Sequence, residues 1–271
     1  MEANVILEKQ DLTYLKWSHV RSSSGTTGSF LKSESNLHGK KIYYKLSNYV
    51  KGDGIVGHEC VNEIIVDRLL TVLGVEHLSY SLINAEIEID GKRYCTYLCS
   101  SGDFKERGES KIAMDTYYRE NKERINAQDE YDFCKRLGLS DYIDTMIAVD
   151  YIIGNRDRHG ANIELLRNSR KKTLRVAPLF DHGISLLSFC RNEKEIENFD
   201  VMEDKTSNNF IGSRSCLDNL KLLNGRKAFA RDLTQDDREY IFADLDGIVS
   251  ELHINRIWEM IYERYKIYES L

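Results

Sequence analysis

Residues 154–162 read GNRDRHGAN, and Ala161 is the one apolar side chain among them. Apolar segments flank this stretch on both sides: DTMIAVDYII precedes it at 144–153, and IELL follows it at 163–166. Catalytic and binding groups often lie on loops that a rigid scaffold positions. We therefore interpret 154–162 as a functional loop held between two pieces of core.

The spacing of acidic and amide residues in this region indicates phosphoryl transfer. Asp157 and Asn162 are five positions apart, and Asp181 follows nineteen residues later in PLFDHG, residues 178–183. Transfer of a phosphoryl group needs a carboxylate that orients the acceptor hydroxyl, and carboxylate and amide oxygens that hold Mg²⁺ against the phosphates. The spacing D-x-x-x-x-N followed by D-x-G is the one that protein kinases use.

Upstream residues supply the other groups that a kinase needs. Lys45 lies in IYYKL, a β-branched and aromatic run that predicts a strand, and can bind the nucleotide phosphates. Glu63 follows eighteen residues later on a predicted helix and is its expected partner, with Glu59 as the substitute. The Ser-, Thr- and Gly-rich segment 22–29 can cover the phosphates with backbone N–H groups from Gly25, Thr26, Thr27 and Gly28.

Periodicity and turn signals predict an α+β chain with two lobes. Apolar spacing predicts a helix over 61–73 that ends at Gly74, and Asp90-Gly91 predicts a β-hairpin. Beyond residue 104 we expect mainly helices, with Ser140 as an N-cap, a T-x-x-D cap at Thr234–Asp237 and a small hairpin within 163–180. The predicted lobes are 1–103, rich in strands, and 104–271, mostly helical, with a hinge near 98–104 where Tyr97, Leu98 and Cys99 offer backbone groups to adenine.

Composition excludes several other classes of protein. The chain has 271 residues and a formal net charge of −6, which argues against a general nucleic-acid binder. No apolar run reaches the length of a membrane helix, and the N-terminus does not resemble a signal peptide. Six cysteines without a second metal-spaced pair predict reduced thiols in a cytoplasmic protein rather than a zinc site, with secretion as an effector left open.

The two motifs resemble the catalytic segments of HipA-like serine/threonine kinases. That family carries G-N-x-D-x-H-x-x-N, matched at 154–162, followed by P-x-[FY]-D-x-G, matched at 178–183, and the similarity extends upstream through Lys45 and the Asn-Glu pair at 62–63. The resemblance implies a bilobal protein-kinase-like fold, ATP with Mg²⁺, and transfer to a Ser or Thr hydroxyl of a protein. It also implies Asp157 as catalytic base, Asn162 and Asp181 as metal ligands, and a Lys45–Glu63 pair.

The resemblance further implies regulation by phosphorylation. HipA-like kinases autophosphorylate in a region that corresponds to the hydroxyl-rich loop, so the expected phosphosites are Ser22, Ser23, Ser24, Thr26, Thr27 and Ser29. A role as a toxin or effector, with an antitoxin-type regulator as partner, is implied in the same way. No direct contact with nucleic acid or membrane is expected.

Several alternatives stay open at this point. Asp157 and Asn162 can form a loop-shaping Asx turn, Lys45 can protect a strand edge, and Glu63 can be a solvated charge. We interpret His159 as a structural residue that bonds backbone carbonyls, and leave Arg156 and Arg158 between phosphate contact and loop bracing. The rival functions are a lipid or small-molecule kinase of the phosphatidylinositol-kinase type, and a non-catalytic pseudokinase or toxin–antitoxin binding module.

Overall fold

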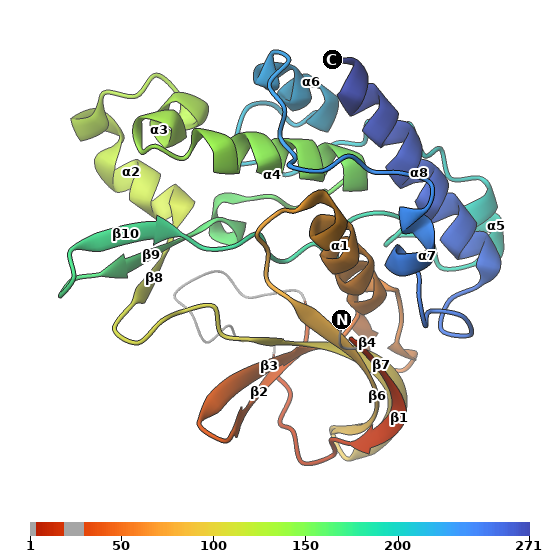
Figure 1. Ribbon diagram of the computed structural model, residues 1–271. Coiled ribbons are helices and arrows are strands. Elements are labelled where there is room, and N and C mark those ends of the chain that lie inside the picture. The colour runs from red at the N-terminus through yellow and green to blue at the C-terminus, as the bar shows by residue number, and fades with distance from the viewer. Residues whose placement is uncertain (1–3, 19–29) are drawn as a thin grey trace.

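The computed structural model describes residues 4–18 and 30–271, and it has a bilobal α+β architecture (Figure 1). The N-lobe contains a five-stranded sheet in the order β1-β6-β7-β3-β2, in which β1 runs parallel to β6 and the other pairs are antiparallel. Its elements are β1 Val5–Asp11, β2 Lys32–Leu37, β3 Lys40–Lys45, the short pair β4 Tyr49–Val50 and β5 Gly54–Ile55, α1 Glu59–Leu73, β6 Tyr80–Ile89 and β7 Lys92–Gly102.

The C-lobe is mostly helical and carries a three-stranded sheet in the order β10-β9-β8. The predicted boundary after residue 103 falls in the connection between β7 and β8. The C-lobe elements are β8 Ser110–Ala113, α2 Met114–Ile125, α3 Glu130–Arg136, α4 Ser140–Ile153, the 3-10 turn η1 Gly160–Asn162, β9 Glu164–Asn168, β10 Thr173–Val176, α5 Glu193–Glu197, α6 Cys216–Leu220, the 3-10 turn η2 Lys221–Leu223, α7 Asp237–Ile241 and α8 Glu251–Ser270.

The Asp90-Gly91 turn sets the register of the N-lobe sheet. Both residues have positive φ angles, 51° and 76°, as a two-residue hairpin with the right twist requires. The turn joins β6 to β7, and β7 then pairs with β3 so that Cys99 lies opposite Lys45. The hairpin predicted from the sequence is confirmed, and it brings the strand after the turn beside the strand that carries the predicted phosphate-binding lysine.

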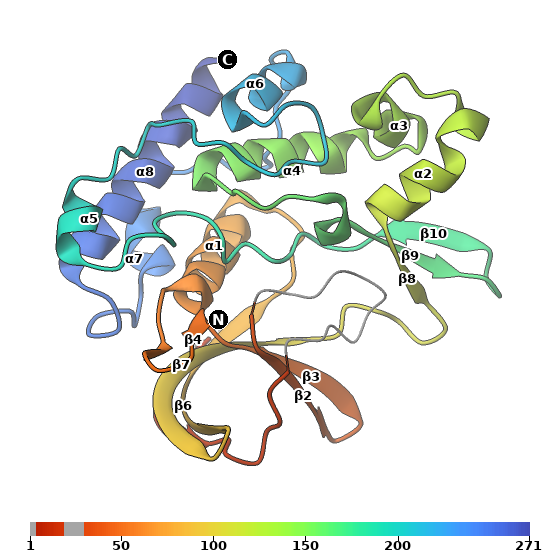
Figure 2. The ribbon, with the colours of Figure 1, turned by 180° about the vertical axis from the view of Figure 1, so that it is seen from behind.

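Helix α1 lies between the sheet and the C-lobe helices in both views (Figures 1 and 2). Apart from the exposed Thr71, every residue of this helix is buried, because one side packs on β6 and β7 and another meets α7. Gly74 ends the helix in the left-handed conformation, as the sequence predicted. A charged residue on α1 is therefore held in the interior of the molecule, unlike one on a surface helix.

Two helix starts differ from the predictions. Helix α4 begins at Ser140, but its N-cap residue is Leu139 and no side chain caps it, because the turn at Gly138 that ends α3 continues directly into α4. At the T-x-x-D signature, Asp237 accepts hydrogen bonds from the backbone N–H and the hydroxyl of Thr234, yet Asp236 occupies the N-cap position. Neither difference moves the predicted catalytic loop, which follows the other end of α4.

A pair of histidines joins the two lobes at the start of α1. The ring of His58, which precedes α1, contacts the ring of His253 in the first turn of α8, with centroids 4.6 Å apart. His253 is 2% exposed, and its Nε2 has no hydrogen-bond partner in the described part of the chain. Burial, aided by the charge of His58, lowers the pKa of His253 to about 4, so this ring is neutral in the folded protein.

We expect acid to weaken the fold through His253. A folded-state pKa below the unfolded value gives stability that is present above about pH 6.5 and is lost as the pH falls toward 4, at a cost of about 3 kcal/mol. Urea unfolding from pH 7.5 to 4.5 measures this loss in the wild type and in His253→Leu. The variant should lose less stability over that range, and an identical pH dependence of the two proteins would contradict the assignment.

No helix in residues 4–18 and 30–271 is both long enough and apolar enough to cross a membrane. All six cysteines carry free thiols, and Cys95 is the exposed one.

Candidate active site

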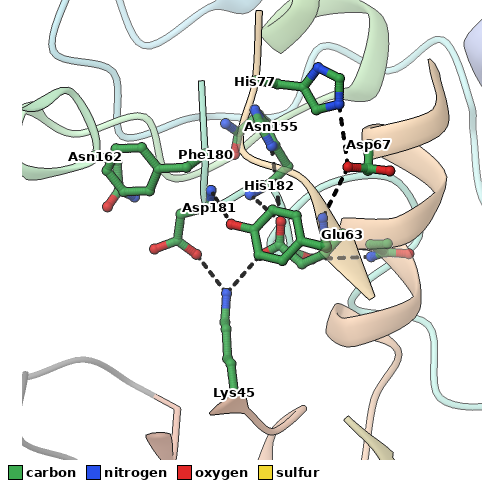
Figure 3. Close-up of polar contacts among 12 residues, drawn as sticks. Lys45, Glu63, Asp67, His77, Asn155, Asn162, Phe180, Asp181 and His182 are labelled. Atoms are coloured by element: carbon green, nitrogen blue, oxygen red, sulfur yellow. Dashed lines mark hydrogen bonds and ion pairs between the residues drawn. The ribbon is translucent and has the colours of Figure 1, made fainter. Parts of the chain in front are cut away.

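Lys45 pairs with one carboxylate from each lobe (Figure 3). Its Nζ atom lies 2.8 Å from Oε1 of Glu63 on α1 and 2.6 Å from Oδ1 of Asp181, which belongs to the C-lobe. The Lys45 side chain is 10% exposed and that of Glu63 is fully buried. The sequence interpretations of Lys45 as a strand-edge guard and of Glu63 as a solvated charge are therefore wrong in this structure.

The two carboxylates keep the Lys45 ammonium group charged. Burial alone lowers the pKa of a lysine, but Asp181 and Glu63 outweigh it and hold the pKa of Lys45 well above its ordinary value. Glu63 has a second role, because its Oε2 accepts the backbone N–H of His182 at 2.9 Å. One glutamate thus positions both the lysine and the backbone that follows Asp181.

The chain around Asp181 adopts an unusual backbone conformation. Asp181 has a φ of 60°, in the left-handed region, and its N–H donates to the hydroxyl of Tyr80 at 3.2 Å. His182 is buried, and burial next to Arg158 places its pKa well below the usual range, so its ring is neutral. Asn62 donates to the carbonyl oxygens of Gly183 and Ser185, which ties this segment to α1. The backbone from Asp181 to Ser185 is therefore held by Tyr80 on β6 and by Asn62 on α1.

Because Gly183 has no side chain, Glu63 can pack against its backbone. A Cβ atom at this position would lie 3.1 Å from the carbonyl oxygen of Glu59 and 3.2 Å from Oε1 of Glu63. These separations are shorter than ordinary van der Waals contact, so an added methyl group must displace α1 or the segment after Asp181.

We expect Gly183→Ala to lower the free energy of unfolding by about 1–3 kcal/mol, because the methyl group crowds Glu63 and weakens its pairing with Lys45. Urea unfolding measures the change. Gly102→Ala is the matched control, since no atom lies within 4 Å of the methyl group that it adds. Equal stabilities of the two variants would show that the space at Gly183 does not matter.

A buried ion pair supports the loop that carries Asp157. Gly154 ends α4 in the left-handed conformation, and the loop then folds back over the end of the helix. Arg158 is 1% exposed, and its Nε and Nη2 atoms donate to the carboxylate of Asp150 at 2.9 Å. Asn155 donates to the same carboxylate at 2.8 Å. Of the two roles left open for Arg158, the structure shows loop bracing.

Arg158 also brings the two predicted metal ligands together. Its Nη1 atom donates to the carbonyl oxygen of Asn162 at 3.2 Å and to that of Phe180 at 2.9 Å. Phe180 directly precedes Asp181, so one guanidinium group fixes the backbone beside both Asn162 and Asp181. The amide of Asn162 donates to the carbonyl oxygen of Asp157 at 2.7 Å, which closes the loop on itself.

The carboxylate of Asp157 lies at the surface of this braced loop, and its side chain is one third exposed. Asn208 donates to Oδ1 at 3.2 Å, and Nε2 of His159 lies 3.7 Å from Oδ2. Nδ1 of His159 accepts the backbone N–H of Ala161, so this ring bonds a backbone amide rather than the carbonyls that the sequence suggested. Asp157 is thus reachable by an acceptor from solvent, as a catalytic base must be.

A cavity of about 740 Å³ opens beside Lys45 between the lobes. Cys99 lines it, whereas Leu98 points to the opposite face of β7 and is buried in a separate apolar cluster. Residues 101–104, which follow Cys99 along the chain, also form part of the wall. The other lining residues include Tyr80, Ser101, Gly102, Asp103, Phe104, Lys111, Phe180 and Asp181.

Aromatic rings and charged side chains line the cavity together. The rings of Phe104 and Phe180 lie 5.4 Å apart, and Lys111 sits 4.0 Å from the Phe104 ring centre. Lys45 and Asp181 belong to the same lining. The lining therefore offers both aromatic surfaces and charged groups to a ligand. The predicted phosphate-covering loop, with Gly25, Thr26, Thr27 and Gly28, and the predicted phosphosites lie outside the described residues.

The donor atoms at this site fit a hard divalent cation. Asp181 presents a carboxylate and Asn162 an amide oxygen, the ligand types that Mg²⁺ takes together with phosphate oxygens. Within 4–18 and 30–271, no group of three or more His, Cys, Asp and Glu residues is placed to hold a metal by itself.

Sequence reasoning did not identify three residues that shape the site: Asp150, Tyr80 and Asn208. Asp150 did leave a signal, since an acid inside an apolar helical run must pair with something when the helix is buried. Tyr80 and Asn208 reach the site only through the tertiary fold, from positions with no distinctive local pattern.

The fold and the site together define a protein-kinase-like structure. A lysine–glutamate pair and an Asp-x-Gly segment meet at an interlobe cavity, and Arg158 joins the Asp–Asn loop to that segment. The sequence is 24% identical over 209 residues to serine/threonine-protein kinase CtkA of Helicobacter pylori strain J99. That alignment covers 74% of this chain and 63% of the kinase, so the chain spans less than two thirds of its relative's length.

One solved structure agrees on the fold. The crystal structure of the Helicobacter pylori proinflammatory kinase CtkA superposes with a TM-score of 0.61 at 17% identity, covering 96% of both chains. HipA from the Shewanella oneidensis HipA–HipB–operator DNA complex gives a TM-score of 0.41 at 12% identity, covering 91% of this chain and 58% of HipA. No protein-family model matches the sequence. The resemblance that the motifs indicated is confirmed by the two CtkA matches.

Proposed function

We propose that this protein is an ATP- and Mg²⁺-dependent kinase that transfers the γ-phosphate to a Ser or Thr hydroxyl of a protein. The observation that carries the proposal is the convergence of Glu63 and Asp181 on Lys45, beside the interlobe cavity that Lys45 and Asp181 line. Asp157, on the loop that Arg158 ties to Asp181, supplies the carboxylate that such a reaction needs. The similarity to a serine/threonine kinase supports the choice of acceptor.

In the proposed reaction, the hydroxyl oxygen of the acceptor attacks the γ-phosphorus of ATP. Asp157 accepts the proton that this hydroxyl loses. A new O–P bond forms, the bond from the γ-phosphorus to the β–γ bridging oxygen breaks, and ADP leaves with that electron pair. Lys45, kept cationic by its two carboxylates, offsets the charge on the phosphate oxygens. Mg²⁺, held through Asn162 and Asp181, would neutralise further phosphate charge when bound.

Incubation of the purified protein with labelled ATP and Mg²⁺ tests this function. The acceptors are a protein mixture, a phosphatidylinositol vesicle and an aminoglycoside, each assayed separately. Label on Ser or Thr of protein is the expected result. Label on the inositide or the aminoglycoside alone would favour a lipid or small-molecule kinase. If no acceptor is labelled and Mg²⁺ with ATP does not raise the unfolding temperature, the protein is a non-catalytic module.

We also propose that the protein phosphorylates itself within residues 22–29, which offer Ser22, Ser23, Ser24, Thr26, Thr27 and Ser29. The support is the resemblance to HipA-like kinases together with the intact set of catalytic residues. Mass spectrometry after incubation with Mg²⁺ and ATP would locate the phosphate. An antitoxin-type regulator and a cytoplasmic location stay predictions from the sequence.

A further inference from the structure

Residues 206–210, within the irregular segment between α5 and α6, lie along the loop that carries Asp157. The backbone N–H of Asn208 donates to the carbonyl oxygen of Arg156 at 2.9 Å, and that of Phe210 donates to Arg158 at 2.8 Å. The Arg156 side chain returns a hydrogen bond to the carbonyl oxygen of Thr206 at 3.3 Å. The two segments are about fifty residues apart in sequence, yet their backbones pair on both sides of Asp157.

This pairing places the amide of Asn208 against the candidate base. The alternating contacts leave Asn208 opposite Asp157, and Nδ2 of Asn208 donates to Oδ1 of Asp157 at 3.2 Å. His159 faces the other carboxylate oxygen at 3.7 Å. The carboxylate therefore has a neighbour on each oxygen, and these two neighbours come from different parts of the chain.

The C-lobe holds the segment around Asn208 in place. The side chain of Asn219 on α6 donates to the carbonyl oxygens of Ile211 and Ser213 and accepts the N–H of Ser213 at 2.7 Å. The N–H of Ser207 donates to the carbonyl oxygen of Arg214. Asn208 thus projects from a segment that is anchored on both sides, although its own side chain is at the surface.

We propose that Asn208 is a positioning residue, which holds the Asp157 carboxylate in the orientation that receives the acceptor's proton. This inference rests on the proposed kinase function and assigns that site a residue from outside both motifs. A carboxylate on an exposed loop can rotate about its side-chain bonds, and a fixed amide donor limits that rotation at the atom that must meet the hydroxyl.

Steady-state kinetics of Asn208→Ala and Asn208→Asp tests the role. We expect Asn208→Ala to lower kcat about 10-fold, the kinetic equivalent of one hydrogen bond to a charged group, with KM for ATP unchanged. Asn208→Asp should lower kcat further, because it replaces the donor with a second carboxylate. Asn209→Ala is the matched control, since its amide donates to Ser213 and Cys216 rather than to Asp157. A kcat for Asn208→Ala equal to that of the control would overturn the proposal.

A second measurement does not depend on activity. The side-chain amide resonances of Asn208 and Asn209 are followed by ¹⁵N NMR in the wild type and in Asp157→Ala. The Asn208 resonance should shift when its acceptor is removed, while that of Asn209 stays in place. If the Asn208 resonance did not shift in Asp157→Ala, the positioning role would be wrong, even if the wild type is an active kinase. If the wild type labels no acceptor, the proposed function fails, and the NMR result still decides whether Asn208 holds Asp157.

Discussion

Asp157→Asn is expected to reduce phosphoryl transfer about 10³-fold, while the unfolding temperature stays at the wild-type value. An amide cannot accept the hydroxyl proton, and general-base catalysis contributes about 10²- to 10⁴-fold. The fold should survive, because the loop is held by the backbone of Asp157 and by the Asp150–Arg158 pair rather than by the Asp157 side chain. Initial rates with labelled ATP and thermal unfolding of the same preparation measure the two effects.

Asp129→Asn is the matched control for this experiment. Asp129 is the N-cap of α3, and asparagine caps a helix about as well as aspartate does. The control should keep both the rate and the unfolding temperature. If Asp157→Asn retained the wild-type rate in protein that is folded and binds nucleotide, Asp157 would not be the catalytic base.

Arg158→Met is expected to destabilise the protein by about 3–5 kcal/mol. The substitution removes the cation from a pair in which Arg158 is 1% exposed and Asp150 is 4% exposed, and leaves a buried carboxylate without a charge partner. Burial alone lowers the pKa of Arg158, but the carboxylate of Asp150 outweighs this effect, so the pKa lies above its ordinary value and the pair is ionised. Urea unfolding near pH 7 measures the loss.

The double variant Asp150→Leu/Arg158→Met separates the stability of the pair from its role in the loop. Replacing a buried ion pair with apolar groups is often neutral or better, so much of the lost stability should return. Activity should not return, since Asn162 and Phe180 still lack the guanidinium group that joins their carbonyl oxygens. If Arg158→Met were as stable as the wild type, the Asp150–Arg158 pair would not support the fold.

Several parts of the fold followed from local chemistry and could be predicted. The Asp90-Gly91 turn tolerates the positive φ angles that a tight hairpin needs, and Gly74 ends α1 in the same way. Each signal depends on only a few neighbouring residues. The helix cap at Ser140 was predicted wrongly, because the position of that helix start depends on the preceding turn at Gly138 rather than on the serine.

The site residues could be predicted from the sequence where their spacing and their residue type indicate the same chemistry. Lys45, Glu63 and Asp181 were named from spacing and residue type, and the structure brings them within hydrogen-bonding distance. Leu98 shows the limit of such reasoning. Its order along the chain suggested a place at the cavity, but alternate residues of a strand face opposite sides, so Cys99 lines the cavity and Leu98 does not.

By itself, the sequence determined which chemical groups this protein has and which elements carry them: a strand lysine, a helix glutamate, a polar loop after a buried helix and an Asp-x-Gly segment. Only the tertiary structure decided which groups meet. Arg158 is buried on Asp150, Tyr80 supports Asp181, and Asn208 reaches Asp157 from 51 residues away. The physical reason is that these contacts depend on how the lobes and loops pack, and packing joins positions that no local pattern in the sequence connects.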